Sequence, residues 1–421
     1  MGDFILTLKP KIYASALTIA LATATSVSYA DNRTQAMGGA GVANGKYTQA
    51  ASLNPALVAN YMQRDNFGLV LPAVFIELAD SDELVDSIDN FQDSYDRLER
   101  LLEQAEQGQP VNEAEVQQAR QQLAQDFADS EGRLNADLNL QASLSIPNRF
   151  LATSIYFNAD ANIFGGSSIA SNDLDTILDA QTPGDLDNLD SEGYIVGYVT
   201  ADLGLAMARN FTIAGREVAI GVAPKLQQME SIAYIAQLDN FDDDDFDAGE
   251  YRTSSDAFNL DLGMSIALSE RTSLGFTVRD LFKHEVSSVP LFSRQAEEPV
   301  LLSYERAPKL TAGVGYNTER MAFSADLDLN AQNYLGLNQE SQLLLFREHL
   351  QVQFARAGFE LDLARWVQFR AGYRHDLKGT YDDAVTAGLG FSPFGRVHIN
   401  VSALYAGENN MGAGAQLAFT F

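Results

Sequence analysis

Apolar and polar residues alternate with a period of two through most of the chain. The clearest segments are 134–146, 258–268 and 321–331, where one set of alternate positions is apolar and the other is polar or small. Successive side chains of a strand point to opposite faces, so each segment predicts a strand with one apolar and one polar face. Less regular segments of the same kind lie at 66–78, 149–163, 192–208, 211–228, 271–286, 300–317, 348–364, 366–377, 383–393, 396–406 and 411–421.

These segments predict an all-β protein, an antiparallel transmembrane β-barrel of about 14 strands. Strands that cross a membrane need about 9–11 tilted residues, longer than the strands usual in soluble sheets. A soluble sandwich or propeller also alternates, but here Asp, Asn, Gln and Ser occupy mid-strand positions, which suits a hydrated interior. Short connections (317–320, 393–396) also alternate with long ones, namely 164–191, 229–256, 287–299 and 332–347. Short turns at one end and long loops at the other are typical of membrane barrels.

One segment, 80–132, departs from the strand pattern. Its apolar residues return at steps of three and four, which predicts amphipathic helices. Gly108 and Pro110 interrupt the pattern, and Asn112 is placed to cap a second helix with Glu115 three residues on. We therefore expect a helical hairpin inserted in an outer loop between the first two strands. A solvated insertion without an interaction role is the alternative.

The first thirty residues predict export. Lys9 and Lys11 precede an apolar run at 14–24, and Ser28 to Ala30 form a small-residue site of the A-x-A type. The run is too short to span a membrane, so we expect a cleavable signal peptide, 1–30, and a mature chain beginning at Asp31. No later stretch is long and apolar enough for a transmembrane helix.

Charge and composition narrow the chemistry. The full chain has a net charge of −29, and removal of residues 1–30 leaves 26 basic against 56 acidic residues, a charge of −30. Such a surplus excludes the basic footprint that nucleic-acid binding requires. The chain has no cysteine and only four scattered histidines, so we expect no metal site and no cofactor. No spacing suggests a nucleophile with its base, and we expect that the protein is not an enzyme.

An acidic loop at 239–247 raises the question of calcium. Clustered carboxylates can bind Ca²⁺, and Glu250 falls at the twelfth position counted from Asp239. The third position is Phe241, however, and the sixth, which needs glycine, is Asp244. The EF-hand interpretation therefore fails, which leaves a solvated acidic tip or a weak divalent site shared with lipopolysaccharide phosphates.

The start of the expected mature chain contains two small-residue motifs. Residues 36–43 read AMGGAGVA, with Gly38, Gly39 and Gly41, and Asn54, Pro55 and Ala56 follow as NPA. Glycines allow positive φ and close backbone approach, and Asn-Pro favours a turn. Together with the strand number and the closing phenylalanine, these motifs resemble the FadL-type outer-membrane channels. That resemblance implies an N-terminal hatch at 31–65 that folds inside a barrel formed by 66–421; a disordered tail is the alternative.

Other motifs are similar to the barrel-shaped members of the plasmid-transfer TraF family. They are the helical insertion at 80–132, the run AGYRHDL at 371–377, GFSPFG at 390–395 and the closing strand at 412–421. This similarity extends over essentially the whole mature chain. It implies an association with conjugal transfer or secretion. No motif matches a fatty-acid pocket residue by residue, so no ligand contact is carried over.

Alternation alone assigns candidate lumen residues. The charged or titratable residues on the polar faces are Arg279, Asp326, Asp328, Arg370, Arg374 and His398. Charged residues that point into a barrel either pair with one another or line water. We expect mainly pairing, with Asp326 and Asp328 as the candidate partners of Arg370 and Arg374.

The last strand suggests how the barrel is assembled. Apolar residues occupy alternate positions through 411–421 and include Phe419 and Phe421. A terminal amphipathic strand ending in Phe resembles the signal that the barrel-assembly machinery reads. We therefore expect that machinery, outer-membrane lipid and lipopolysaccharide as partners in the bacterial outer membrane, with a small hydrophobic ligand as a further candidate.

Two functions remain open from the sequence. The first is a hatch-gated channel for small hydrophobic molecules, indicated by the glycine-rich segment, NPA and the strand number. The second is a surface or structural component of a conjugal-transfer or secretion assembly, indicated by the TraF likeness and the helical insertion.

Overall fold

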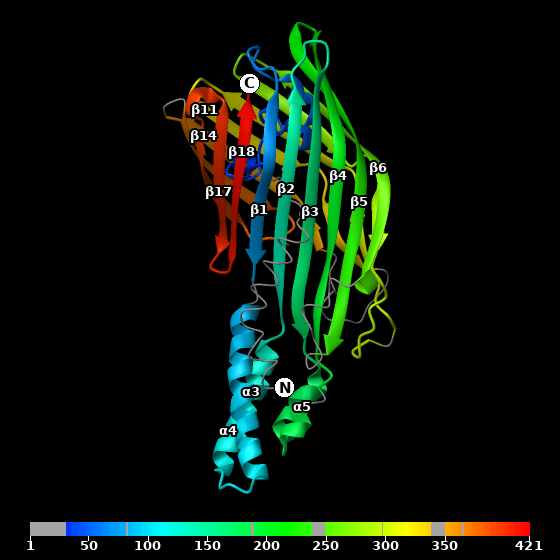
Figure 1. The fold of residues 1–421 in the computed structure, drawn as a ribbon, viewed down its shortest axis with the longest axis vertical. Coiled ribbons are helices and arrows are strands. Elements are labelled where there is room, and N and C mark those ends of the chain that lie inside the picture. The colour runs from blue at the N-terminus through cyan, green and yellow to red at the C-terminus, as the bar shows by residue number, and fades with distance from the viewer. Residues whose placement is uncertain are drawn as a thin grey trace.

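A computed structural model describes residues 31–80, 83–186, 189–237, 249–296, 298–337, 350–363 and 366–421. The expected signal peptide and the acidic loop at 239–247 lie outside the described residues. Within the described part, fourteen antiparallel strands close into one barrel, as the alternation predicts (Figure 1). The barrel strands are β1 (Gly68–Ala79), β2 (Gly132–Ile146), β3 (Ala152–Ser168), β4 (Glu192–Ile213), β5 (Arg216–Gln237), β6 (Arg252–Ala267), β7 (Thr272–Arg279), β10 (Lys309–Asn317), β11 (Met321–Asp328), β14 (Phe354–Asp362), β15 (Val367–Asp376), β16 (Ala384–Phe391), β17 (Val397–Gly407) and β18 (Asn410–Thr420).

The two faces of each strand follow the sequence pattern. On β2, Ser143 and Ser145 are buried toward the lumen, whereas Leu144 and Ile146 are exposed on the outside. On β11, Ser324 is fully buried and Phe323 is 43% exposed. Apolar side chains outside and polar ones inside invert the order of a soluble protein and match a barrel that faces lipid. None of the described helices is both long and apolar enough to cross a membrane.

The two ends of the barrel differ, and we call them the turn end and the loop end. At the turn end, short connections join the strands, and exposed aromatic side chains lie in or next to these connections, including Phe150, Phe211, Trp366 and Phe394. The ring of Trp366 packs edge-on against Phe391, with 5.4 Å between ring centroids. Aromatic girdles of this kind mark the membrane–water interface of barrels.

At the loop end, the strands extend beyond the membrane thickness. β4 and β5 each contain 22 residues, about twice what a crossing needs. The sequence pattern predicts these strands as 192–208 and 211–228, but β4 continues to Ile213, the turn lies at 214–215, and β5 continues to Gln237. The extra residues are explained by continued pairing, from Glu192 with Gln237 down to Ile213 with Arg216.

The predicted helical hairpin forms at the loop end. α3 (Leu84–Glu106) and α4 (Glu113–Asp129) lie between β1 and β2, and the side chain of Asn112 caps α4 by accepting from the Ala114 N–H at 3.1 Å. Leu98, Leu123 and Phe127 are fully buried in a core shared with Ile177 of α5 (Ser171–Asp179). Figure 1 shows the three helices side by side beyond the barrel rim.

Three predicted strands, 271–286, 300–317 and 348–364, are each divided in the structure. β7 ends at Arg279 and is followed by β8 (His284–Ser287), while β9 (Leu302–Arg306) precedes β10. The last of the three becomes β13 (Leu350–Val352), outside the barrel, and β14, in the barrel wall. β8 and β9 join β12 (Gln332–Leu337) and β13 in a separate four-stranded sheet, the inner sheet. Alternation cannot separate these strands from the barrel strands, because both have a period of two.

The remaining helical pieces are short. They are α2 (Asn32–Gln35), η1 (Ala50–Ser52), η2 (Pro55–Ala59), η3 (Pro183–Leu186), η5 (Gly249–Tyr251) and η7 (Pro393–Gly395). The first three belong to residues 31–65, which we call the N-terminal segment. This segment lies inside the barrel at the turn end (Figure 1).

A lipid-facing charge tests the assignment of faces. Leu389→Arg on β16 should destabilise the barrel by about 2–4 kcal/mol, because the guanidinium would enter hydrocarbon. Glu319→Arg in the exposed β10–β11 turn is the control and should change stability by at most about 1 kcal/mol. Equilibrium unfolding in lipid bilayers measures both, and equal effects would contradict a membrane-facing outer surface.

Candidate functional site: the filled lumen

The N-terminal segment is folded by local hydrogen bonds. Asp31 caps α2, because its carboxylate accepts from the Arg33 N–H at 3.0 Å. Asn54 caps η2 in the same way, accepting from the Ala56 N–H at 3.1 Å, and Pro55 occupies the first helical position. Gly38 and Gly39 have positive φ, which bends the chain between these pieces. The predicted motif residues therefore act as turn and cap residues.

Backbone and side-chain hydrogen bonds hold this segment against the barrel wall. One carboxylate oxygen of Asp326 on β11 accepts from the N–H groups of Gly41 and Val42, at 2.7 and 2.9 Å. The amide of Asn54 donates to the Val42 carbonyl at 2.8 Å and to the Met264 carbonyl of β6 at 3.2 Å. Asn54 thus joins two parts of the segment to each other and to the wall.

Further polar contacts extend around the inner wall. They join Asn32 to β1 and β17, Thr48 and Ser52 to β2, Asn44 to β10 and β11, Ala43 to β7, Gly38 to β16, Gln49 to β18 and Asn210 of β4 to Ala59. Because these contacts surround the segment, it fills the cross-section at the turn end. Every residue from 31 to 59 except Lys46 is buried.

A belt of glycines in the wall lets the segment lie this close. A Cβ atom built on Gly372 would lie 2.1 Å from the Gly38 nitrogen, and one on Gly275 would lie 2.2 Å from the Val42 oxygen. The same conflict with the segment occurs across the belt, which consists of Gly68, Gly221, Gly263, Gly275, Gly315, Gly358, Gly372, Gly388 and Gly414. Glycine inside a strand permits close approach of another backbone, which is its role here.

An ion pair anchors the start of the segment. The guanidinium of Arg33 donates to both oxygens of Glu360 on β14, at 2.9 and 3.2 Å. Arg370 on β15 donates to the same carboxylate at 2.6 Å and to Asn400 at 2.8 Å. We call Arg33, Glu360 and Arg370 the ionic latch, because it joins the segment to two wall strands.

The predicted lumen residues all lie on the inner side, but their partners differ from the expectation. Arg370 pairs with Glu360, and Arg374 pairs with Glu77 on β1 at 2.5 Å, so neither pairs with Asp326 or Asp328. Asp328 instead pairs with Arg356 at 2.9 Å and with Lys309 at 3.2 Å. The predicted pairing was wrong because register across strands, and not position along the chain, decides which charges meet.

The two other candidates also lie toward the lumen. His398 is placed between Ser392 and Thr420, with ring nitrogens 3.0 and 2.9 Å from their hydroxyls. Arg279 lies opposite Lys309 on the lumen side of β7, near the carboxylates that surround Lys225.

A charged layer lies next to the N-terminal segment on its loop-end side. Lys225 on β5 is fully buried, and its ammonium lies 2.6 Å from Asp280, 2.9 Å from Asp202 and 3.2 Å from Asp261. Arg306 of the inner sheet pairs with Asp160 at 2.7 Å. Removing one partner of such a buried set costs about 3–5 kcal/mol. Alternation along the chain does not single out this layer, although Lys225, Asp202 and Asp261 all occupy polar-face positions.

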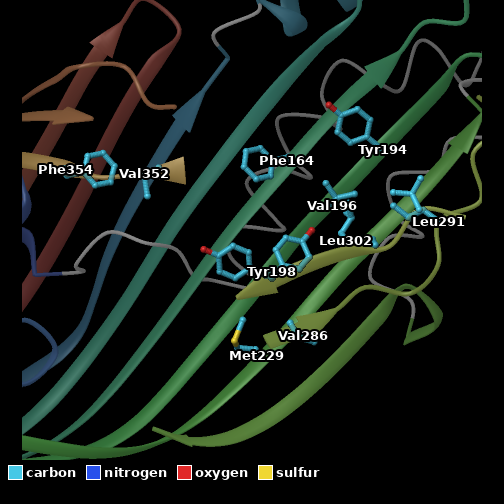
Figure 2. Packing of buried hydrophobic residues seen from close by; sticks show 13 residues of the cluster. Phe164, Tyr194, Val196, Tyr198, Met229, Val286, Leu291, Leu302, Val352 and Phe354 are labelled. Atoms are coloured by element: carbon cyan, nitrogen blue, oxygen red, sulfur yellow. The ribbon is translucent and has the colours of Figure 1, made fainter. Parts of the chain in front are cut away.

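An aromatic cluster lies beyond the charged layer. Phe164, Tyr198 and Met229 project inward from β3, β4 and β5, and they pack against Leu302 and Tyr304 of the inner sheet. Figure 2 shows these wall side chains and the inner-sheet side chains converging in the lumen. The inner sheet therefore covers the lumen at the loop end with apolar side chains.

The closing strand completes the wall beside the first one. Phe421 exchanges backbone hydrogen bonds with Phe67, donating at 3.0 Å and accepting at 3.1 Å. Their rings stack with 4.9 Å between centroids, and Phe419 stacks on Phe421. No group of three His, Cys, Asp or Glu in the described part of the chain is arranged to hold a metal ion.

Comparison with known proteins gives a family and a fold. The model of the family described as "F plasmid transfer operon, TraF, protein" matches residues 51–328. Among solved structures, the Pseudomonas putida toluene transporter TodX is similar over 94% of this chain and 99% of its own, with a TM-score of 0.53 and 12% identity. The Ralstonia pickettii toluene transporter TbuX has the same values.

A Pseudomonas aeruginosa FadL homologue is similar over 95% of this chain and 99% of its own, with a TM-score of 0.51 and 12% identity. No curated protein matches the sequence. At these identities the similar structures establish a shared barrel fold.

The glycine belt can be tested by adding a single methyl group. Gly372→Ala should push the N-terminal segment off the wall, because no space exists for Cβ, and such overpacking costs about 1–3 kcal/mol. Channel openings in planar bilayers should become more frequent. Gly249→Ala is the control, since no atom lies within 4 Å of its Cβ position. Unchanged openings in Gly372→Ala would show that the belt does not hold the segment.

The ionic latch can be tested against a matched pair. Glu360→Gln and Glu77→Gln each leave buried arginine without its carboxylate, and each should lose about 3–5 kcal/mol of stability. Only Glu360→Gln should release the N-terminal segment, because Glu77 pairs with the wall residue Arg374. Limited proteolysis followed by mass spectrometry measures cleavage within 31–65. Equal cleavage in the two variants would show that the ionic latch does not hold the N-terminal segment against the wall.

Proposed function

This chain belongs to the family described as "F plasmid transfer operon, TraF, protein", and we propose that it is an outer-membrane channel for small hydrophobic molecules, gated by residues 31–65. The observation that carries the proposal is the arrangement of the lumen. A closely fitted segment closes its turn end, and a buried aromatic cluster occupies its loop end. The fold shared with toluene transporters supports the same function.

The aromatic cluster gives the lumen affinity for apolar molecules. Barrel interiors are ordinarily polar, since water fills them. Here Phe164, Tyr198, Met229 and Tyr304 are buried between wall and inner sheet. A binding pocket for a small ligand is typically apolar with a few placed polar groups, and this cluster has that composition.

Passage requires the N-terminal segment to move. Its backbone is bonded to Asp326 and its Arg33 to Glu360, so an axial path at the turn end opens only when these bonds break. The segment is otherwise rich in small residues, which lets it shift without large side chains catching on the wall. We assign the hatch role to residues 31–65 on this basis.

The proposed orientation places the turn end in the periplasm and the helices α3 to α5 outside the cell. Short periplasmic turns and long outer loops are the usual arrangement. Asp31 is 2% exposed inside the barrel, which supports cleavage of residues 1–30 before the segment folds there. Recognition of the closing strand by the barrel-assembly machinery, and contact with lipopolysaccharide on the outer side, belong to the same proposal.

A transport role needs no catalytic group, and we propose none. The similar structures are channels and not enzymes. The buried charges in the lumen are explained by their mutual pairing.

A second candidate is a surface component of a conjugal-transfer or secretion assembly. The helical projection at the loop end favours it, because α3 and α4 form their own core beyond the barrel rim. The projection is acidic, and its connection to the rim includes Asp190, whose pKa is lowered by hydrogen bonds from Asn172 and Arg294. Cross-linking from the surface of α3 in intact cells should recover a partner protein, and recovery of assembly factors alone would weaken this candidate.

The channel proposal is tested first by what the protein carries. Mass spectrometry of small molecules extracted from protein purified from native outer membranes in mild detergent should reveal an enriched apolar species. A control barrel prepared alongside should lack it. A deletion strain should also take up that species more slowly. Recovery of bulk phospholipid and lipopolysaccharide alone, with unchanged uptake across a panel of apolar molecules, would favour the assembly role.

A further inference from the structure

We propose that the lumen contains a binding site for a small aromatic molecule bearing one neutral hydrogen-bonding group, of the phenol type, and that Tyr304 occupies this site in the closed protein. The site lies where the aromatic cluster meets a row of amide and hydroxyl side chains on β2 to β4. This inference rests on the proposed function and specifies its substrate class.

Unpaired polar atoms identify the polar side of the site. Both side-chain atoms of Asn139 are buried without a hydrogen-bond partner, and so are the hydroxyls of Thr200 and Tyr304. The carbonyl oxygens of Gln141 and Asn158, in the adjacent row, share this condition. Buried polar groups in proteins are almost always hydrogen-bonded. A concentration of unpaired ones therefore indicates a place that a ligand group completes.

Strand register brings these groups together. Asn139 of β2 lies opposite Asp160 of β3, Asp160 opposite Thr200 of β4, and Thr200 opposite Met229 of β5. All four side chains point into the lumen, so they form one row that begins polar and ends apolar. Tyr198 is the next lumen residue on β4 toward the loop end, and it belongs to the aromatic cluster.

The inner sheet places Tyr304 over this row. Arg306 on β9 bonds to Asp160 in the middle of the row, at 2.7 Å. Tyr304, two residues earlier on the same face of β9, packs against Tyr198, with the two rings tilted by 45° and 5.1 Å between their centroids. Its side chain is fully buried, and its hydroxyl finds no partner. A phenol ring of the protein itself therefore lies beside Tyr198, at the apolar side of the row, and its hydroxyl does not complete the hydrogen bonds of Asn139 and Thr200.

Charge decides which polar group the ligand carries. The one formal charge in the row, Asp160, is compensated by Arg306. A carboxylate or ammonium placed there would be a buried charge without a counter-ion, which is strongly unfavourable. Asn139 and Thr200 each offer a donor and an acceptor, so a neutral hydroxyl, which both donates and accepts, suits the site best.

Binding thus requires Tyr304 to leave, and β9 is suited to that movement. β9 is a five-residue strand within a small sheet formed by the loop-end connections, and it is not part of the closed barrel. Tyr304 consequently acts as an internal occupant that a ligand of the same chemistry displaces.

Direct binding to a variant with the site vacated tests the proposal. Tyr304→Ala should bind p-cresol about tenfold more tightly than toluene, since the two probes differ only by a hydroxyl. It should not bind 4-methylbenzoate measurably. Isothermal titration of purified protein in detergent gives all three affinities. Tyr304→Val serves if the alanine variant does not fold.

The second variant tests the polar row itself. Adding Thr200→Val to Tyr304→Ala should lower p-cresol affinity several-fold toward that of toluene and leave toluene binding unchanged. Thr277→Val in the same background is the matched control, because Thr277 is also buried on the lumen side but donates to the Leu262 carbonyl. Equal affinity for p-cresol and toluene in Tyr304→Ala, or no effect of Thr200→Val, would overturn the proposal.

Failure here is distinguishable from failure of the channel role. Binding in detergent does not depend on transport, whereas uptake by cells does. Uptake of apolar molecules without preferential p-cresol binding would support the channel function and contradict the proposed phenol site. Binding of p-cresol by a protein that transports nothing would support the phenol site and contradict the channel function.

Discussion

The close contact between the N-terminal segment and the barrel wall is the constraint on which the rest of the lumen depends. A side chain at Gly263, Gly275 or Gly372 would occupy space that atoms of the segment already fill. Because the wall offers bare backbone at these positions, the segment can use its own N–H groups to reach Asp326. The turn end is therefore closed by packing and by hydrogen bonds together.

Burial of charge follows from that closure. Once water is excluded, each ionised group must be compensated by protein groups, since an unpaired buried charge is strongly unfavourable. Glu360 is shared by Arg33 and Arg370, and Lys225 is surrounded by three aspartates. The two charge clusters join different parts of the protein. The first joins a movable segment to the wall, whereas the second joins wall strands to one another and to the base of the inner sheet.

The inner sheet makes the loop end unlike the turn end. Residues 31–65 meet the wall through backbone and small side chains, but the inner sheet meets it through large apolar ones such as Leu302 and Tyr304. An apolar molecule can therefore gain contacts at the loop end that the turn end does not offer. The inner sheet at the loop end and the N-terminal segment at the turn end therefore suit a protein that binds an apolar molecule at the loop end while its turn end is closed.

The strands of the barrel wall are specified by the local pattern of residues along the chain. A period of two sets which face of each strand meets lipid, and helical spacing sets α3 and α4, because both patterns are local properties of the chain. The glycine-rich motif and the turn at Asn54 and Pro55 were also recognisable, whereas the capping of η2 by Asn54 appears only in the structure. The glycines of the belt were visible on polar faces, although nothing local says what they would touch.

Only the tertiary structure decided the pairing of charges and the separation of the inner sheet. Arg374 meets Glu77 across 297 residues, and the partners of Arg370 and Asp328 were likewise set by register between strands. β8 and β9 share the alternation of barrel strands, yet they leave the wall to cover the lumen. Such choices depend on which segments become neighbours when the barrel closes, and that information lies in three-dimensional contacts and not in the spacing of residues along the chain.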